Sequence, residues 1–377
     1  MKHRLRIGIE VQRLFRKKKH GMEVVALEII KQLQQIDTYN EYFLYVRTDV
    51  DVCIKETSNF KIRVLPARSY FTWEQLVLPA AVKGDNLDFL HSTCNTSALR
   101  LSVPLLLTLH DIIYLEKTDF KGTAYQNFGN IYRRIIVPRV VANSKVVITV
   151  SNFERNVILE KLKLPADKVE VIYNAVNPKF CIDFRDTEID DFRKSHSLPE
   201  SFILFLGNTA PKKNTLNVIK AYVQYKRKAV EGLPIVILDY DKEIVYALLE
   251  KLSAGDLKSD FLFPGYIPSD KMPLLYFSST LFLYPSLRES FGLPILEAMA
   301  CGVPVITSNT SSMPEVAGDA ALFVDPYNVE EITAKMIEVL DDPELRERLN
   351  LCGLKRAAEF TWKLAAEKLL TIYHNMV

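Results

Sequence analysis

The feature that most constrains the fold is a regular alternation of short apolar runs with segments of helical periodicity. Apolar runs rich in leucine and β-branched residues occur at 5–11, 42–46, 61–65, 105–109 and 146–150. Between them, apolar residues recur at helical spacing, as at Met22, Val25, Ala26, Ile29, Leu33 and Ile36, and again at Phe128, Ile131, Tyr132, Ile135 and Ile136. Continuous apolar strands joined by helical crossovers are typical of a parallel sheet covered on both faces. The first half is therefore predicted to be a doubly wound α/β domain.

The same alternation begins again after a polar interruption. Further strands are predicted at 202–206, 235–238, 281–284, 303–307 and 321–324. The segment 177–200 is rich in Asp, Arg and Ser and is bounded by Pro178 and Pro199, which is typical of an interdomain linker. A chain of 377 residues is also too long for one ordinary core. We therefore expect two Rossmann-like domains, residues 1–180 and 200–361, facing each other across a cleft.

Charge and cysteine content exclude several functional classes. The chain has 48 Lys and Arg against 46 Asp and Glu, so its net charge of +2 gives no indication of nucleic-acid binding. Its five cysteines are scattered without a C-x-x-C pair, which argues against a disulfide framework or a structural zinc site. No apolar run is long enough to span a bilayer, and the N-terminus has no apolar segment of signal-peptide length. These features predict a cytoplasmic protein.

One local cluster of positive charge stands out. Arg13 and residues 16–20, with the sequence RKKKH, form a basic run near the N-terminus. Such a run is either a solvated loop or a surface that contacts phosphates or anionic lipid headgroups. Peripheral attachment at the inner face of a membrane therefore stays open as an expectation.

The segment YPSLRESFGLPILEAMACG, residues 284–302, has the properties of a phosphate site. A strand ends at Tyr284, Pro294 suits the first position of a helix, and Gly302 suits its end. The amides of Phe291, Gly292 and Leu293 are then expected at the helix start, where unpaired N–H groups and the helix dipole favour a diphosphate. Gly292 would also allow the backbone to approach the ligand closely.

Charged side chains flank this expected helix start. Glu297 is expected in the first turn, where a carboxylate can accept from two adjacent ribose hydroxyls, and Glu289 precedes the helix across the phosphate. The segment FLGNTAPKKN, residues 205–214, places Lys212 and Lys213 after the first strand of the second domain. The chain contains neither G-x-x-x-x-G-K-[ST] nor G-x-G-x-x-G, which argues against an NTPase or a dehydrogenase.

In the first domain, His110 and Gly21 are candidate ligand contacts. His110 follows the strand at 105–109, at the edge of the sheet where ligands bind in parallel α/β domains. It could touch a sugar or serve a structural role, and no metal-binding histidine motif is present. Gly21 begins the helix after the first strand, where it either admits a ligand or simply starts the helix.

These motifs together resemble one enzyme family. SLRESFGLPILEAMACGVPVITSNTSSMPEVAGDAALFVDP, preceded in order by LHDIIY, TVSNFERN, VIYNAVNPKF and FLGNTAPKKN, resembles the family-four glycosyltransferases of GT-B fold. The resemblance spans nearly the whole chain and is densest over residues 202–326. Its closing segment FTWKLAAEKLLTIYH resembles the last helix of that family, which implies that residues 362–377 return to complete the first domain.

The resemblance implies a function and residue roles. Glu289 would bind the sugar hydroxyls, Glu297 the ribose, the amides of residues 291–293 the phosphates, and Lys213 the leaving diphosphate, with His110 near the reacting sugar. The implied reaction transfers a hexose from a nucleoside-diphosphate sugar, with retention of anomeric configuration, to a glycan or lipid-linked acceptor in surface-polysaccharide assembly. No cofactor and no metal would be required. GNTAPKKN is similar to segments of mannosyl-transferring members, which favours GDP-mannose.

The chain departs from the family pattern at three places. Many members carry Arg where this chain has Asn208 and Gly where it has Ser290, so Lys212 is expected to supply the second cationic contact. The strand at 235–238 runs into Asp239-Tyr240-Asp241, where relatives commonly have glycine. Local nucleotide contacts are therefore expected to differ.

Two alternative functions stay open at this point. Asp49-x-Asp51 and Asp239-x-Asp241 match the D-x-D pattern by which metal-dependent GT-A transferases hold a divalent cation with the diphosphate. Two α/β lobes around a cleft are also typical of sugar receptors, which perform no chemistry.

Overall fold

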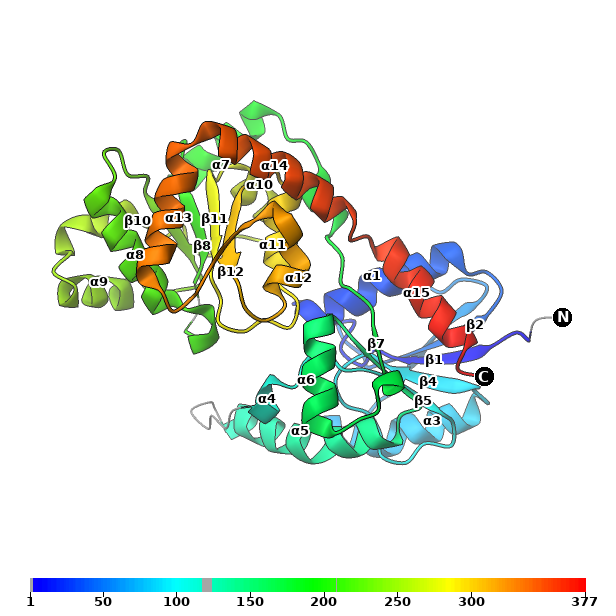
Figure 1. Cartoon of the computed structure of the whole chain (residues 1–377). Coiled ribbons are helices and arrows are strands. Elements are labelled where there is room, and N and C mark those ends of the chain that lie inside the picture. Colours follow the sequence, from blue (N-terminus) through cyan, green and yellow to red (C-terminus); the bar gives the residue numbers. More distant parts are fainter. Residues whose placement is uncertain (1–2, 117–123, 208) are drawn as a thin grey trace. The chain divides into compact units, whose positions relative to one another are not determined.

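The computed structural model describes residues 3–116, 124–207 and 209–377, with side chains except those of 124–128. The chain divides into two compact units (Figure 1). The first unit contains Met1–Asn174 together with Trp362–Val377, and the second contains Ala175–Thr361.

The first unit is built on a parallel sheet with the strand order β3-β2-β1-β4-β5-β6-β7. These strands are β1 (Arg6–Glu10), β2 (Glu41–Val46), β3 (Phe60–Val64), β4 (Phe89–Ser92), β5 (Leu105–Thr108), β6 (Val146–Thr149) and β7 (Val169–Val171). The order reverses at β1, because the chain first adds strands on one side and then crosses to add β4 on the other. Right-handed crossovers in opposite directions place helices on both faces of the sheet.

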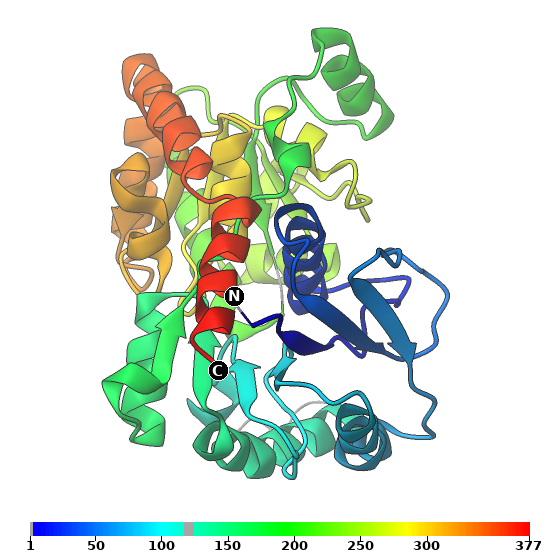
Figure 2. The same cartoon turned by 90° about the vertical axis from the view of Figure 1, so that its right-hand side faces the viewer.

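Two layers of helices cover this sheet (Figure 1). On one face lie α1 (Gly21–Ile36) and α15 (Trp362–His374), which pack against each other, as Figure 2 also shows. The other face is covered by α3 (Leu78–Gly84), α5 (Ala124–Asn143) and α6 (Asn152–Leu162), and the strand residues facing them are apolar, such as Leu90, Leu105 and Leu107. The short helices α2 (Tyr70–Thr72) and α4 (Ile113–Glu116) and a π-helical turn, Trp73–Val77, complete the unit.

The second unit repeats the architecture with the strand order β10-β9-β8-β11-β12-β13. Its strands are β8 (Ile203–Leu206), β9 (Ile235–Leu238), β10 (Phe261–Leu262), β11 (Leu281–Tyr284), β12 (Val305–Ser308) and β13 (Leu322–Val324). Its helices are α7 (Asp186–Ser195), α8 (Thr215–Lys228), α9 (Lys242–Lys251), α10 (Met272–Phe277), α11 (Leu293–Ala300), α12 (Met313–Ala317), α13 (Val329–Asp341) and α14 (Pro343–Ala358). Helices α8, α9 and α13 bury one sheet face in a continuous apolar core, and the order of strands reverses between β8 and β11.

The doubly wound parallel sheets predicted from the sequence are confirmed in both units. All ten predicted strands are present, and β4, β7 and β10 are additional. The strand β4 escaped prediction because its sequence FLHS ends in polar residues, although all four residues are buried. His91 is accommodated there because its ring nitrogens lie 2.7 Å from the hydroxyls of Tyr373 and Thr108.

The predicted linker at 177–200 differs from the structure. The chain passes from the first unit to the second between Asn174 and Ala175. The predicted linker contains helix α7, which belongs to the second unit. Only Phe192 of this helix is buried, Asp186 and Glu188 lie in its first turn, and Arg193 and Lys194 lie in its last. Such a polar helix has too few apolar residues for periodicity to reveal it.

Among the described residues, no helix is both long and apolar enough to cross a membrane.

Candidate active site

Two charged segments of the second unit meet at the point where its strand order reverses. Lys212 and Lys213 lie in a 3₁₀ turn, Pro211–Lys213, that follows β8, and Glu289 lies in the loop that follows β11. Because β8 and β11 are adjacent and parallel, both segments leave the same edge of the sheet. Open α/β sheets bind ligands at this reversal of strand order.

The side chains at this edge form a compact ionic cluster. Lys213 Nζ lies 2.8 Å from Glu289 Oε1 and donates to the Tyr284 hydroxyl at 2.7 Å. Tyr284 in turn donates to Glu289 Oε1 at 3.0 Å, and Lys212 Nζ lies 3.5 Å from Oε2. The Lys213 and Glu289 side chains are only 18% and 11% exposed. Two predicted site residues are thus in direct contact and largely withdrawn from water.

The electrostatics keep Glu289 ionised. Burial alone raises the pKa of Glu289, but the charges of Lys213 and Lys212 and the hydrogen bonds from Lys213 and Tyr284 outweigh it and lower the pKa below its ordinary value. Burial and the adjacent carboxylate raise the pKa of Tyr284 well above its ordinary range, so this phenol stays protonated. Glu289 is therefore a hydrogen-bond acceptor at neutral pH, held by two donors.

Helix α11 begins beside this cluster. Gly292 precedes its first residue with φ +103°, a conformation that L side chains rarely adopt. Among the described residues, the N–H groups of Gly292 and Leu293 make no hydrogen bond. The predicted helix start at Gly292 is confirmed, with Pro294 one position later than expected, and Gly302 follows the helix end with φ +68°.

Two serines that the sequence analysis did not single out hold the loop before α11. Ser311 Oγ accepts from the amide of Glu289 at 3.0 Å and donates to its carbonyl at 2.5 Å. Ser312 Oγ lies 2.9 Å from the carbonyl oxygens of Glu289 and Phe291. These hydrogen bonds fix the backbone of the loop immediately before the N-terminus of α11, where an anion is expected to bind. A serine pair after a strand carries no distinctive sequence signal, so only the structure reveals this role.

Glu297 lies one turn further along the helix than predicted. It is the fifth residue of α11, which puts it in the second turn rather than the first. Its Oε2 accepts from the Tyr276 hydroxyl at 3.1 Å. Burial raises the pKa of Glu297 to about 7, against the opposing effects of Tyr276 and Lys179. A carboxyl with so few donors in a desolvated position has capacity to accept hydroxyl groups of a ligand.

The predicted site residues of the first unit do not belong to a charged cluster like that of Lys213 and Glu289. His110 is buried after β5, and its Nε2 lies 3.0 Å from the carbonyl oxygen of Thr93. Burial lowers the pKa of His110, so its ring is neutral at neutral pH. Gly21 is the first residue of α1, where a Cβ would meet no atom within 4 Å. Asn208 lies outside the described residues, and the sugar contacts of His110 and Gly21 stay predictions.

Comparisons with known proteins identify the family. The sequence model described as "Glycosyltransferase Family 4" matches residues 19–180, and "Glycosyl transferases group 1" matches residues 186–356. The chain belongs to glycosyltransferase family 4. The first match lies almost entirely in the first Rossmann-like unit of this family-four chain, and the second match lies in the second unit.

Several curated relatives of the family-four chain are mannosyltransferases. The O-antigen chain mannosyltransferase B of Escherichia coli is 32% identical over 61% of this chain and 61% of its own length. The serotype-specific mannosyltransferase WbdA of E. coli is 31% identical over 67% of this chain but 31% of its own length. The O-antigen chain mannosyltransferase RfbU of Salmonella typhimurium is 25% identical over 83% of this chain and 81% of its own. The matched region thus spans less than two thirds of the first two relatives.

Solved structures establish the fold. A glycosyltransferase from Rickettsia africae matches with a TM-score of 0.72 at 18% identity, covering 99% of this chain and 98% of that chain. The sucrose-phosphate synthase of Thermosynechococcus elongatus matches with a TM-score of 0.73 at 18% identity and covers 99% of both chains. The fold of the family-four chain is therefore GT-B, as the sequence predicts.

The D-x-D segments of the family-four chain have other partners. Asp51 pairs with Lys19 at 2.6 Å in the first unit. In the second unit, Asp241 caps α9 by accepting from the amide of Glu243, and Asp239 has φ +57°, a left-handed conformation that glycine adopts most readily. The GT-A alternative is not favoured, because the fold is GT-B and the two segments lie in separate units.

Proposed function

We propose that this family-four chain transfers a hexose, most simply mannose from GDP-mannose, to a glycan or lipid-linked acceptor during assembly of a surface polysaccharide. The observation that carries this proposal is the Lys213–Glu289–Tyr284 cluster beside the start of α11. At one edge of the sheet, this arrangement places the Lys213 ammonium group and the ionised Glu289 carboxylate beside the N–H groups of Gly292 and Leu293, which make no hydrogen bond among the described residues. The names of the mannosyltransferase relatives support the choice of sugar and pathway.

Each group has a distinct role in the proposed binding of the donor. The Gly292 and Leu293 amides and Lys213 would hold the diphosphate, since a helix start and a lysine both favour negative charge. Glu289, kept ionised, would accept hydrogen bonds from hydroxyls of the hexose. Glu297 would accept from the ribose hydroxyls, and Lys212 would add a second positive charge to the phosphate region.

The proposed reaction retains the anomeric configuration without a protein nucleophile. The acceptor hydroxyl attacks the anomeric carbon on the face from which the nucleoside diphosphate departs. The bond from the anomeric carbon to the diphosphate oxygen breaks, the new glycosidic bond forms, and the hydroxyl proton passes to the departing diphosphate. Lys213 and the α11 amides would stabilise the negative charge that develops on this leaving group, which is the usual work of preorganised donors.

A donor screen tests this function. Purified protein is incubated with GDP-mannose, UDP-glucose or ADP-glucose and a lipid-linked oligosaccharide fraction, and release of nucleoside diphosphate is measured. Thermal shifts with GDP, UDP and ADP report the base independently of the acceptor. Release from GDP-mannose with an α-linked product supports the proposal, whereas inverted product or binding without any release contradicts it.

We also propose that neither a divalent metal nor another cofactor is needed and that the chain contacts the inner face of a membrane. Turnover unchanged by EDTA would support the first point, and turnover restored only by Mn²⁺ would contradict it. Lys17 and Arg139 are exposed basic residues that could meet anionic lipid. Co-sedimentation with vesicles rich in phosphatidylglycerol at low salt tests the second point, with neutral vesicles as the control.

A further inference from the structure

A buried tyrosine links the two charged groups of the candidate donor site. Tyr284 is the last residue of β11, is 1% exposed, and stacks its ring on that of Phe282 with the centroids 5.5 Å apart. Because β11 lies between β8 and β12, the core of the second unit fixes the position of this phenol. Lys213 and Glu289, in contrast, lie on the loops that follow β8 and β11. The Tyr284 hydroxyl is therefore the rigidly held member of the cluster.

The chemistry of the three groups sets the direction of their hydrogen bonds. An ammonium group can only donate, and an ionised carboxylate can only accept. The Tyr284 hydroxyl lies 2.7 Å from Lys213 Nζ and 3.0 Å from Glu289 Oε1, so it accepts from the lysine and donates to the glutamate. Burial and the charge of Glu289 raise the pKa of Tyr284 well above its ordinary value. The phenol therefore keeps the proton that it donates.

Lys213 cannot serve both Glu289 and a diphosphate. Its ammonium group lies 2.8 Å from Glu289 Oε1, but a diphosphate carries more negative charge than one carboxylate and attracts the ammonium group more strongly. When Lys213 moves to the diphosphate, Glu289 loses its nearest positive charge. Burial disfavours the charged form of a carboxyl group, so Glu289 would then tend to take up a proton. A protonated Glu289 is a poorer acceptor for sugar hydroxyls.

The other charged groups around Glu289 compensate only part of this loss. Lys212 Nζ lies 3.5 Å from Oε2, but its side chain is 38% exposed, so water screens its charge. Arg288 donates to the backbone carbonyl of Glu289 at 2.9 Å. Glu297, on α11, adds negative charge near Tyr284. Tyr284 is therefore the buried donor that remains on Glu289 Oε1.

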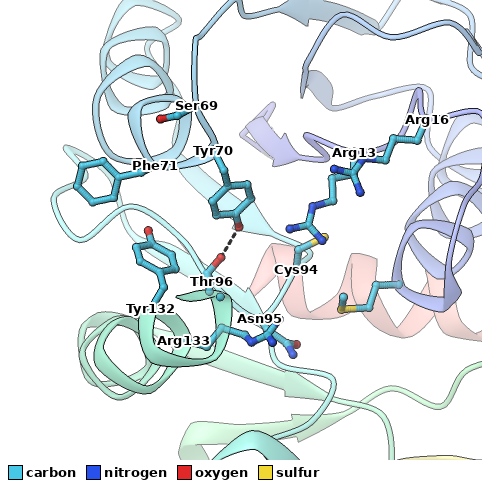
Figure 3. Close-up of a pocket in the computed structure, with 12 residues that line it drawn as sticks. Arg13, Arg16, Ser69, Tyr70, Phe71, Cys94, Asn95, Thr96, Tyr132 and Arg133 are labelled. Atoms are coloured by element: carbon cyan, nitrogen blue, oxygen red, sulfur yellow. Dashed lines mark hydrogen bonds between the residues drawn. The ribbon is translucent and has the colours of Figure 1, made fainter. Parts of the chain in front are cut away.

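The first unit contains a buried glutamate that is held by uncharged donors. Glu74 is 2% exposed and forms no salt bridge with the residues that the structure describes. The Tyr70 hydroxyl lies 2.8 Å from its carboxyl group, and the hydroxyls of Thr96 and Tyr132 each lie at 2.5 Å. Figure 3 shows these three side chains together beside a pocket. Hydroxyl groups can thus hold a buried acid in this protein without a cation.

We propose that Tyr284 is a positioning residue that allows Lys213 to change partner during donor binding. The ring and hydroxyl of Tyr284 hold the Lys213 ammonium group beside the phosphate site, with Nζ 4.6 Å from the ring centroid. When Lys213 moves to the diphosphate, the hydrogen bond from Tyr284 keeps Glu289 ionised and directed at the hexose. This inference rests on the proposed transferase function.

Proton uptake on nucleotide binding tests this exchange without turnover. Tyr284→Phe removes the hydroxyl and retains the ring. Isothermal titration with GDP, UDP and ADP at pH 6, in buffers of different ionisation enthalpy, counts the protons that accompany binding. Tyr284→Phe should take up more protons per nucleotide than the wild type, because Glu289 has lost its fixed donor when Lys213 moves away. Adding Glu289→Gln to this variant should abolish the excess, which a merely structural role of Tyr284 would leave unchanged.

Tyr222→Phe is the matched control. It also removes the hydroxyl of a buried tyrosine of the second unit, which donates to the carbonyl of Leu233 at 2.9 Å. This variant should take up protons as the wild type does.

Kinetics provide a second measurement. The kcat of Tyr284→Phe at pH 7 should fall about 10-fold while the KM for the donor changes less than about threefold, since the lost hydrogen bond acts on a charged group. The acid limb of its kcat profile should also move to higher pH. In Tyr222→Phe the acid limb should stay in place.

Four results would overturn the proposal. They are no binding of any of the three nucleotides to the wild type, equal proton uptake by the wild type and Tyr284→Phe, an excess that persists in the double variant, and the same excess in Tyr222→Phe. If thermal unfolding shows that Tyr284→Phe does not fold, 3-fluorotyrosine in place of Tyr284 decides. It keeps the hydroxyl as a stronger donor and should reduce the proton uptake, and unchanged uptake would contradict the proposal.

Failure of the transferase function can be told apart from failure of this inference. Nucleotide binding without release of nucleoside diphosphate from any sugar donor would contradict the function, and the proton counts would still report on Tyr284. Normal turnover together with wild-type proton uptake and an unmoved acid limb in Tyr284→Phe would contradict only the role of Tyr284.

Discussion

Replacing Lys213 with alanine is the most direct test of the donor site. The change removes the 2.8 Å contact to Glu289, the 2.7 Å hydrogen bond to Tyr284 and the packing of Nζ 4.6 Å from the Tyr284 ring centroid. If this ammonium group meets the departing diphosphate, turnover should fall by about 10²-fold or more, the scale for loss of one transition-state contact. Release of nucleoside diphosphate at saturating donor measures this fall.

The same variant has a predictable effect on stability. Breaking a buried ion pair usually costs about 3–5 kcal/mol, because the remaining charge has no partner. Lys212 Nζ, 3.5 Å from the other oxygen of Glu289, still compensates part of that charge. We therefore expect a loss of about 2 kcal/mol in the free energy of unfolding at pH 7, measured by urea denaturation, with the fold retained.

The pH dependence gives an independent check with a definite sign. In the wild type the pKa of Glu289 lies below its ordinary value of 4.5, so the pair stabilises the protein above that pH and its contribution disappears as the pH falls further. Without Lys213, burial is opposed mainly by Lys212 and Tyr284, and the pKa of Glu289 should rise. The advantage of the wild type over Lys213→Ala should therefore grow from pH 4 to pH 7.

The neighbouring lysine provides the matched control. Lys212 is 38% exposed and lies farther from the carboxylate, so Lys212→Ala should lower turnover only a few-fold and change stability by about 1 kcal/mol or less. Near-wild-type turnover of Lys213→Ala, or equal losses in the two variants, would refute the reasoning.

Three further predictions concern the loop and helix around the site. Glu289→Gln should reduce turnover by about 10²-fold or more at unchanged nucleotide affinity, which separate turnover and thermal-shift measurements will compare. Glu297→Gln should weaken nucleotide binding about 10-fold. The raised pKa of Glu297 means that the free energy of unfolding of the wild type falls as the pH rises from 4.5 to about 7. The variant has no such carboxyl group, so urea titrations should show its stability increasing relative to that of the wild type over this interval. Gly292→Ala should destabilise the fold by about 1–2 kcal/mol and weaken binding of GDP, because φ is +103° and the new Cβ would lie 3.2 Å from Ile295 Cδ1; an unchanged melting temperature and affinity would contradict this.

The sequence predicts most of the scaffold because the strands of a parallel sheet are continuous and apolar. The alternation identified ten strands correctly, and the helix start at Gly292 followed from Pro294 and Gly302. The alternation did not identify a strand whose burial depends on contacts with residues far away in the sequence. The strand β4 contains His91, whose polar nitrogens are satisfied only by Thr108 and by Tyr373 from a distant part of the chain.

The sequence named some residues of the candidate site but could not show which of them come into contact. Lys213 and Glu289 are separated by 76 positions, and only the adjacency of β8 and β11 brings them into contact. Ser311 and Ser312 were missed, because a hydroxyl that fixes a loop carbonyl has no sequence pattern of its own. For the basic run the sequence left open a solvated loop or a surface that contacts anions, and it could not show that Lys19 pairs with Asp51 or that Arg13 lines a pocket of the first unit.

The return of α15 to the first unit affects how the protein is made. Tyr373 contacts Phe89 and His91, so one face of this unit is covered by residues that leave the ribosome after the entire second unit. Until then, the apolar surface beneath α15 stays exposed on the nascent chain. The first unit therefore cannot complete its packing until the second unit has been translated.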